Sequence, residues 1–261
     1  MSSGRQAARH AFVWRPRRET WLALVSTVLL LVVYRGSTLL AATSPLAAEI
    51  AFLVLGGLVT CTLIPVMVVR RASGASSAGL GITRVRLAPA LLVSAIFAAG
   101  SSPALFTQAS AAGVPLIPHV TASLLNLWEP LFVYGWLQLR FEDAFGYVPA
   151  PLLAGACLGV YHLGSVPLDQ VFGYLAWGTT IGMLFALTRN LFAVFPFAWG
   201  IAGAIGTVTV APAGWIDALA GAVLLAAQVA VLLALLPRCE SSNPGVNLAT
   251  PCEVDSGRER A

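Results

Sequence analysis

The sequence contains no lysine and few charged residues of any kind. Only 10% of its 261 residues are charged, whereas typical soluble domains carry about 25%. A chain this poor in charge cannot cover a water-exposed surface, so the composition excludes a sizeable soluble domain. The hydrophobic fraction of 58% and the mean hydropathy of +0.83 instead indicate an integral membrane protein. Apolar runs of about eighteen residues or more recur along the chain, and each can cross a bilayer core.

Cysteine is also scarce, and its placement indicates neither a disulfide framework nor a metal site. Cys61 and Cys157 lie within apolar runs and are expected to be small buried thiols. Cys239 and Cys252 lie in the polar C-terminal segment without CxxC or metal-type spacing, which favours reduced thiols. The first apolar run is too long for a signal-peptide core and has no small-residue cleavage site, so we expect it to be retained.

The hydropathy pattern predicts an all-α polytopic membrane protein with about eight transmembrane helices. The predicted spans are Trp21–Leu40, Leu46–Val69, Leu87–Thr107, Leu116–Leu139, Val148–Leu163, Val171–Leu187, Leu191–Val210 and Trp215–Leu236. The fifth is the weakest of them, because it is short and rich in glycine. The predicted chain organisation is a basic cytoplasmic tail over 1–19, a transmembrane helical domain over 20–236 and a polar, disordered cytoplasmic tail over 237–261.

The positions of the arginines predict the orientation of these spans. All 15 basic residues are arginine. With eight spans and a cytoplasmic N-terminus, every arginine except Arg35 falls on the cytoplasmic side, as the positive-inside rule requires. The sequence thus predicts a multi-pass protein of the cell membrane with both termini in the cytoplasm. The net charge of +4 follows from this placement, so we expect the lipid bilayer and no nucleic acid as a partner.

Two ionisable residues lie well inside the predicted spans, where such residues are rare and often functional. Glu129 is in the middle of the fourth span, about ten residues or ~15 Å from its cytoplasmic end, and His162 lies about twelve residues or ~18 Å into the fifth. On antiparallel neighbouring helices the two side chains would reach a similar depth. They could share a proton or hold a water or a metal. Equally, a protonated glutamate and a neutral histidine could form a purely structural pair.

Two residues close to Glu129 in the sequence could affect its carboxyl group or its helix. Asn126 precedes Glu129 by three residues and can face the same side of a helix, where it could orient the carboxyl group or join two helices. Pro130 removes a backbone donor and is expected to kink the span.

Four segments carry a resemblance to a known family. Residues 129–146 read EPLFVYGWLQLRFEDAFG, residues 158–163 read LGVYHL, residues 191–200 read LFAVFPFAWG, and residues 78–83 read AGLGIT. Over about 121–206 the chain resembles the CAAX-protease and bacteriocin-processing (CPBP) family of intramembrane peptidases. Its members have eight helices and the motifs Glu-Glu-x-x-x-Arg, Phe-x-x-x-His and His-x-x-x-Asn/Asp, and often a Leu-Gly-Leu patch upstream.

The chain departs from the family at most polar positions. Aligned on Gly135, Glu129 takes the first Glu position and His162 takes the His of the second motif. The other motif positions carry different residues: Pro130 (second Glu), Tyr134 (Arg), Leu158 (Phe), Trp199 or Gly200 (third-motif His) and Gly203 or Ala204 (Asn/Asp).

The resemblance implies an endopeptidase in which a glutamate activates a water that attacks a peptide bond of a membrane-associated peptide or protein. Glu129 would be the general base and His162 its partner at the oxyanion. Asn126, Tyr134 and Tyr161 could support them or serve packing alone. In the family the histidines hold a divalent metal such as zinc by another account, but too few ligands remain here for tight binding.

Two other classes of function remain open. The missing motif residues favour a catalytically inactive CPBP homologue that acts as a membrane binding or regulatory module. A proton-coupled transporter would also contain a lone buried acid, but it would typically have discontinuous helices in corresponding halves, and the sequence indicates none.

Overall fold

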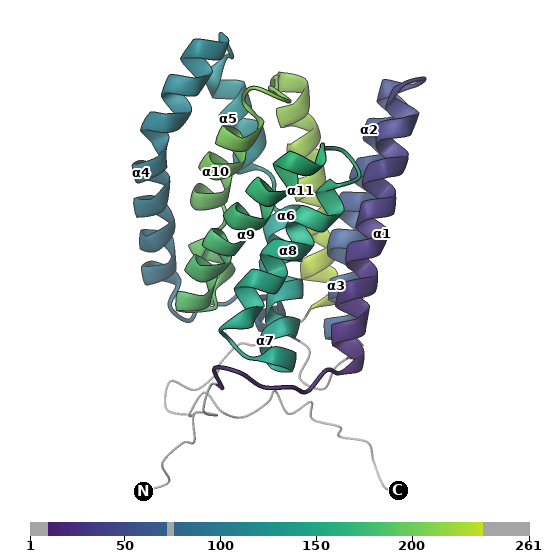
Figure 1. Ribbon diagram of the computed structural model, residues 1–261, viewed down its shortest axis with the longest axis vertical. Coiled ribbons are helices and arrows are strands. Elements are labelled where there is room, and N and C mark those ends of the chain that lie inside the picture. The colour runs from purple at the N-terminus through teal and green to yellow at the C-terminus, as the bar shows by residue number, and fades with distance from the viewer. Residues whose placement is uncertain (1–9, 72–75, 237–261) are drawn as a thin grey trace, which may run out of the picture.

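The computed structural model describes residues 10–71 and 76–236, and all regular structure within these ranges is helical. The helices form one bundle along a common axis (Figure 1). Three segments lie outside the described residues: most of the predicted basic tail, four loop residues, and the predicted polar tail with Cys239 and Cys252. The elements are α1 (Arg18–Ala41), α2 (Pro45–Ala51), the π-helical η1 (Phe52–Leu63), α3 (Ile64–Arg71), η2 (Ser77–Leu80), α4 (Leu87–Ala112), α5 (Leu116–Leu124), α6 (Trp128–Pro130), the π-helical η3 (Leu131–Gln138), α7 (Leu139–Phe145), α8 (Pro149–His162), α9 (Leu168–Thr188), η4 (Leu191–Ala193), α10 (Phe197–Thr207) and α11 (Trp215–Leu235).

Five helices within the described ranges are long and apolar enough to cross a membrane, which makes the chain a helical membrane protein. They are α1, the continuous run from α2 through η1 to α3, and α4, α9 and α11. The other three predicted spans coincide with helices that are short or interrupted. Helix α8 has 14 residues and α10 has 11. Eight crossings therefore remain a prediction.

The predicted span Leu116–Leu139 is divided, and the expectation of one continuous helix was wrong here. Helix α5 ends at Leu124, and a new helical run begins at Trp128 and continues through η3 to the end of α7. Pro130 lies in the first turn of this run. Backbone N–H groups there have no intrahelical partner, so the N–H that proline lacks costs the helix no hydrogen bond. The proline therefore helps to begin a helix instead of kinking one.

The π-helical segment η3 is the centre of the bundle, and all of its residues are buried. Its polar side chains bond to the helices around it. The indole N–H of Trp136 donates to Ser26 on α1 over 3.1 Å, and Nε2 of Gln138 donates to the Gly182 carbonyl on α9 over 2.9 Å. In apolar surroundings such bonds hold helices to one another. This central position fixes the residues just before it, which include Glu129.

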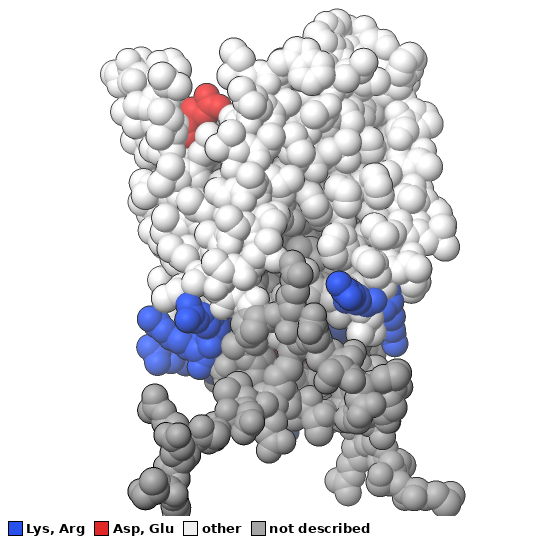
Figure 2. Space-filling view, turned by 180° about the vertical axis from the view of Figure 1, so that it is seen from behind, with Lys and Arg blue, Asp and Glu red and all other residues white. Residues whose placement is uncertain are grey.

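Arginine side chains gather at one end of the bundle (Figure 2). This is the end at which α3 finishes with Arg70 and Arg71. The described part of the loop before α4 packs there: Nδ2 of Asn190 donates to the carbonyls of Thr83 and Val85, over 2.9 Å each. At this end, the described loop residues before α4 are therefore held against the segment that follows α9.

Helices α8 and α9 approach each other through glycines. A Cβ added at Gly155 would lie 2.6 Å from the carbonyl oxygen of Leu175, and one at Gly178 would lie 2.9 Å from the Cα of Gly155. Backbones this close leave no room for a side chain, as in other membrane helix pairs with small residues at their contact. The contact fixes α8, and with it His162, against α9.

Replacing Gly155 by alanine should destabilise the bundle, because the new methyl group must push α9 away. We expect a loss of roughly 1–3 kcal/mol, as for other overpacked sites. Gly173→Ala is the matched control, since a Cβ there meets nothing within 4 Å. Thermal unfolding in detergent, followed by circular dichroism, measures both. Equal melting temperatures for Gly155→Ala and the unmodified chain would contradict the packing.

Candidate functional site

The structure brings Glu129 and His162 together inside the bundle. Nε2 of His162 lies 3.7 Å from Oε1 of Glu129, and the two residues are only 7% and 8% exposed, respectively. Both stand at helix ends: Glu129 is in the first turn of the run that begins with α6, and His162 is the last residue of α8. Two residues that the sequence predicts at a similar depth are therefore neighbours in space.

Both oxygens of the Glu129 carboxyl group have a donor from the protein. The hydroxyl of Tyr161 donates to Oε1 over 2.8 Å, and Nδ2 of Asn126 donates to Oε2 over a longer 3.4 Å. Two of the three predicted supporting residues are thus brought to the carboxyl group. Tyr134 is placed elsewhere, because its hydroxyl donates to the Gly178 carbonyl over 3.2 Å. Its bond ties η3 to α9.

The contacts of His162 determine which ring nitrogen carries the proton. Nδ1 lies 2.8 Å from the carbonyl oxygen of Leu158. A carbonyl only accepts, so Nδ1 is the N–H and the neutral ring presents the lone pair of Nε2 toward Glu129. The separation of 3.7 Å is too long for a hydrogen bond. It is nevertheless short enough for one water oxygen to lie within about 2.8 Å of both atoms.

The helix ends add an electrostatic asymmetry to this pair. Glu129 lies near the N-terminus of the helical run Trp128–Phe145, and His162 lies at the C-terminus of α8. Helix dipoles favour negative charge at an N-terminus and positive charge at a C-terminus. The backbone therefore favours the charge distribution that results when a proton moves from the carboxyl group to the imidazole.

Three tyrosine rings surround the imidazole. Tyr174 on α9 stacks on His162 with ring centroids 3.9 Å apart and an interplanar angle of 16°, and Tyr161 and Tyr34 lie at 4.7 and 5.1 Å. These rings fix the orientation of the imidazole. Tyr34 and Tyr174 were not predicted from the sequence. Tyr34 lies well inside the predicted span Trp21–Leu40, which could have marked it, whereas Tyr174 lies near the start of Val171–Leu187, where tyrosine is common at the interface.

The positions expected for the third family motif are used for packing. A Cβ on Gly200 would lie 2.6 Å from Cδ2 of Leu124, so a larger side chain does not fit there without a shift. Trp199 packs against Tyr134, with ring centroids 5.8 Å apart. Helix α10 therefore brings no ligating side chain from these positions to Glu129.

A zinc ion does not fit the donor set of this site. The described residues contain no group of three or more His, Cys, Asp or Glu side chains close enough to hold a metal. Glu129 and His162 alone supply two ligands, fewer than catalytic zinc sites use.

His119, which lies at the outer start of the fourth predicted span, has a structural environment. It is fully buried; its Nε2 donates to the Ala204 carbonyl over 2.9 Å, and its Nδ1 accepts the Ala213 N–H over 3.0 Å. Both nitrogens are occupied in joining α5 to α10 and to the segment before α11. Cys61 and Cys157 are buried free thiols, as predicted.

Comparisons with protein-family models, with curated proteins and with solved structures found no match for this chain.

Replacing Tyr161 by phenylalanine should disturb the Glu129 carboxyl group, because it removes the donor to Oε1. We expect a destabilisation of about 1–3 kcal/mol from the unpaired buried oxygen. The infrared carboxyl band that disappears in Glu129→Gln should also shift. Tyr134→Phe is the matched control: it removes a buried tyrosine bond to a carbonyl and should leave that band in place. A band unchanged by Tyr161→Phe would show that the hydrogen bond is not formed.

Proposed function

We propose that the chain is a divergent CPBP-type intramembrane endopeptidase that cleaves a membrane-associated peptide or protein. The observation that carries the proposal is the environment of one carboxyl group. Glu129 is buried, accepts a hydrogen bond from Tyr161 and faces the unprotonated nitrogen of His162. A carboxylate and an imidazole that can both contact one water are the minimum needed to activate that water.

In the proposed reaction the carboxyl proton first moves to Nε2 of His162, which leaves Glu129 as a carboxylate. Glu129 then accepts a proton from the water while the water oxygen bonds to the carbonyl carbon of the substrate. The electron pair of the C=O bond moves to the oxygen, and the protonated His162 donates to this oxyanion. The proton held by Glu129 then passes to the leaving nitrogen as the C–N bond breaks. Tyr161 and Asn126 act as positioning residues, because they hold the carboxyl group and need not touch the substrate.

The membrane arrangement that we propose has eight crossings and both termini on the cytoplasmic side. Two features support it: α1 begins and α11 ends at the same end of the bundle (Figure 1), and the arginines gather at that end (Figure 2). Positive charge next to membrane helices marks the cytoplasmic side.

A second candidate function is a catalytically inactive relative that binds or regulates another membrane protein. The packing of Gly200 against Leu124 and the bond from Tyr134 to Gly178 favour it, because these positions are occupied by structural contacts. The two candidates differ in one measurable property, which is peptide-bond cleavage.

Glu129→Gln and His162→Ala should each lower cleavage of a transmembrane peptide by at least about 10²-fold, the usual contribution of general acid–base catalysis. The assay uses the purified full chain in liposomes, with products detected by mass spectrometry. Glu19→Gln, at the start of α1, serves as a control and should retain full activity. Absence of cleavage across a wide pH range and a broad peptide panel would exclude the peptidase and leave the binding module.

Single cysteines on either side of the short helix α8 should be labelled from opposite faces of the membrane. Tyr147→Cys precedes α8 and Leu168→Cys follows it, and both positions are exposed. In a chain whose native cysteines are replaced by serine, an impermeant maleimide added outside intact cells should label position 168 only. Position 147 should react after permeabilisation. Labelling of both from one side would show that α8 does not cross, and eight crossings would be wrong.

A further inference from the structure

A pocket opens beside the break between α5 and α6, near the end of the bundle opposite the arginines (Figure 1). It has a volume of about 210 Å³ and lies between α2, η1, the break and α11. One water molecule needs only about 10–15 Å³ of such volume, together with two to four polar partners. The pocket therefore has room for several water molecules.

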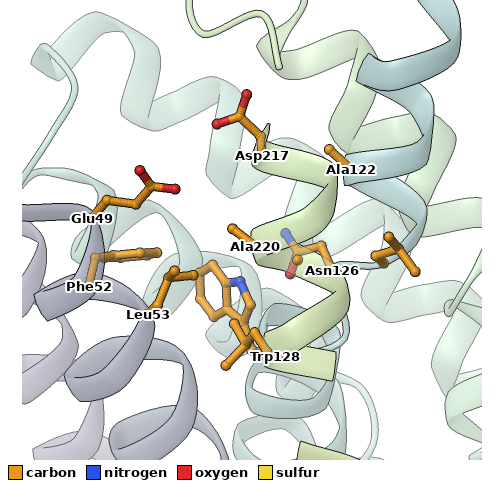
Figure 3. Close-up of a pocket in the computed structure, with 11 residues that line it drawn as sticks. Glu49, Phe52, Leu53, Ala122, Asn126, Trp128, Asp217 and Ala220 are labelled. Atoms are coloured by element: carbon orange, nitrogen blue, oxygen red, sulfur yellow. The ribbon is translucent and has the colours of Figure 1, made fainter. Parts of the chain in front are cut away.

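Polar side chains line this pocket from its rim to its deeper end. Glu49 comes from α2, Asp217 from the first turn of α11 and Asn126 from the break. Figure 3 shows the two carboxylates above Asn126 and Trp128. Asp217 is exposed and Glu49 is partly buried. Because charged groups are costly in contact with lipid tails, this rim belongs to the aqueous layer beside the membrane.

One side chain separates the pocket from the Glu129 carboxyl group. Asn126 lines the pocket, and its Nδ2 donates to Oε2 of Glu129 over 3.4 Å. A bond of this length is weak, so Asn126 can exchange it for a bond to water. Trp128, the residue before Glu129, also lines the pocket. The Glu129 side chain keeps 10% of its surface accessible, so the surrounding protein does not seal it completely.

Toward the arginine-rich end, the chain is closely packed below Glu129. All eight residues of η3, which follow Glu129 in that direction, are buried. A second pocket, of about 310 Å³, lies at that end, and the residues of this helical run that line it are Leu139, Arg140 and Asp143, beyond η3. The buried segment η3 therefore lies between that second pocket and the carboxyl group.

We infer that water reaches Glu129 through the first pocket, from the membrane face opposite the arginines. Since the proposed hydrolysis uses one water for each peptide bond, this route rests on the proposed function and serves the same site. Water enters at the carboxylates of Glu49 and Asp217 and passes Asn126 to reach the carboxyl group. Asn126 is thus a positioning residue that also forms the last wall between the pocket and Glu129.

Hydrogen–deuterium exchange at Glu129 tests this route without a substrate. The infrared carboxyl band that disappears in Glu129→Gln shifts when the group exchanges in D₂O. It is followed in the purified full chain in detergent, at a pH low enough for the band to be present. Ala220 lines the pocket on α11. Ala220→Trp should fill the pocket and slow the exchange at least about tenfold, since exchange then requires a local opening of the bundle.

Leu219→Trp is the matched control, because Leu219 is the neighbouring residue on α11, is exposed and does not line the pocket. It should exchange at the rate of the unmodified chain. Ala122→Trp fills the pocket from α5 and replaces Ala220→Trp if circular dichroism shows that the latter is unfolded.

Unchanged exchange in a folded variant with a filled pocket would overturn the inference, and so would equal slowing by Leu219→Trp. The peptide-cleavage assay separates this result from the proposed function. Exchange that slows when the pocket is filled, in a chain that cleaves no peptide, supports the water route and excludes the peptidase. Cleavage by a chain whose exchange is unchanged by filling supports the peptidase and excludes the route.

Discussion

A carboxyl group inside an apolar bundle must find its hydrogen-bond donors within the protein, because lipid offers none and an unpaired polar group there costs several kcal/mol. Glu129 meets this requirement with Tyr161 from α8 and Asn126 from the break before α6. Much of the surrounding architecture follows from it. The regular helix is interrupted over residues 125–127, where Asn126 lies, and the glycine contact of α8 with α9 holds Tyr161 and His162 in place.

The positions of the helices could be predicted because hydropathy and the length of a membrane span are strong, local signals. Each predicted span coincides with a helical segment, although only five reach membrane-crossing length within the described ranges. The break could not be predicted in the same way. The predicted span Leu116–Leu139 stays apolar at this point because of Leu124, Leu125 and Leu127. A continuous membrane helix also tolerates a single asparagine or proline, such as Asn126 or Pro130. The segments that pack there, α11 against α5 and η1 against α6, come from distant parts of the chain, and local sequence does not encode these contacts. Such a break is also a transporter feature, but transporters repeat it in a corresponding half.

The depth of the two main residues of the candidate site could be predicted by counting residues along two helices. A fixed rise per residue sets depth, so the levels of Glu129 and His162 could be compared from the sequence alone. The direction of a side chain around a helix depends on packing, and the sequence does not encode it locally. Segment η3 is buried on every side, so Tyr134 could have pointed at any neighbour, and it points at α9. Tyr34 and Tyr174 reach His162 from α1 and α9 for the same kind of reason, through contacts between distant segments.

The shortness of α8 and α10 has a consequence for the thickness of the protein. At 14 and 11 residues they measure only about 21 Å and about 16 Å, against about 30 Å for a hydrocarbon core. Longer helices stand beside them, α1 and α9 next to α8 and α4 next to α10. Lipid beside α8 and α10 can thus meet longer helices, so these two short helices do not require a thinner bilayer. At α8 and α10 the protein is therefore shallower than at α1, α4 and α9 beside them.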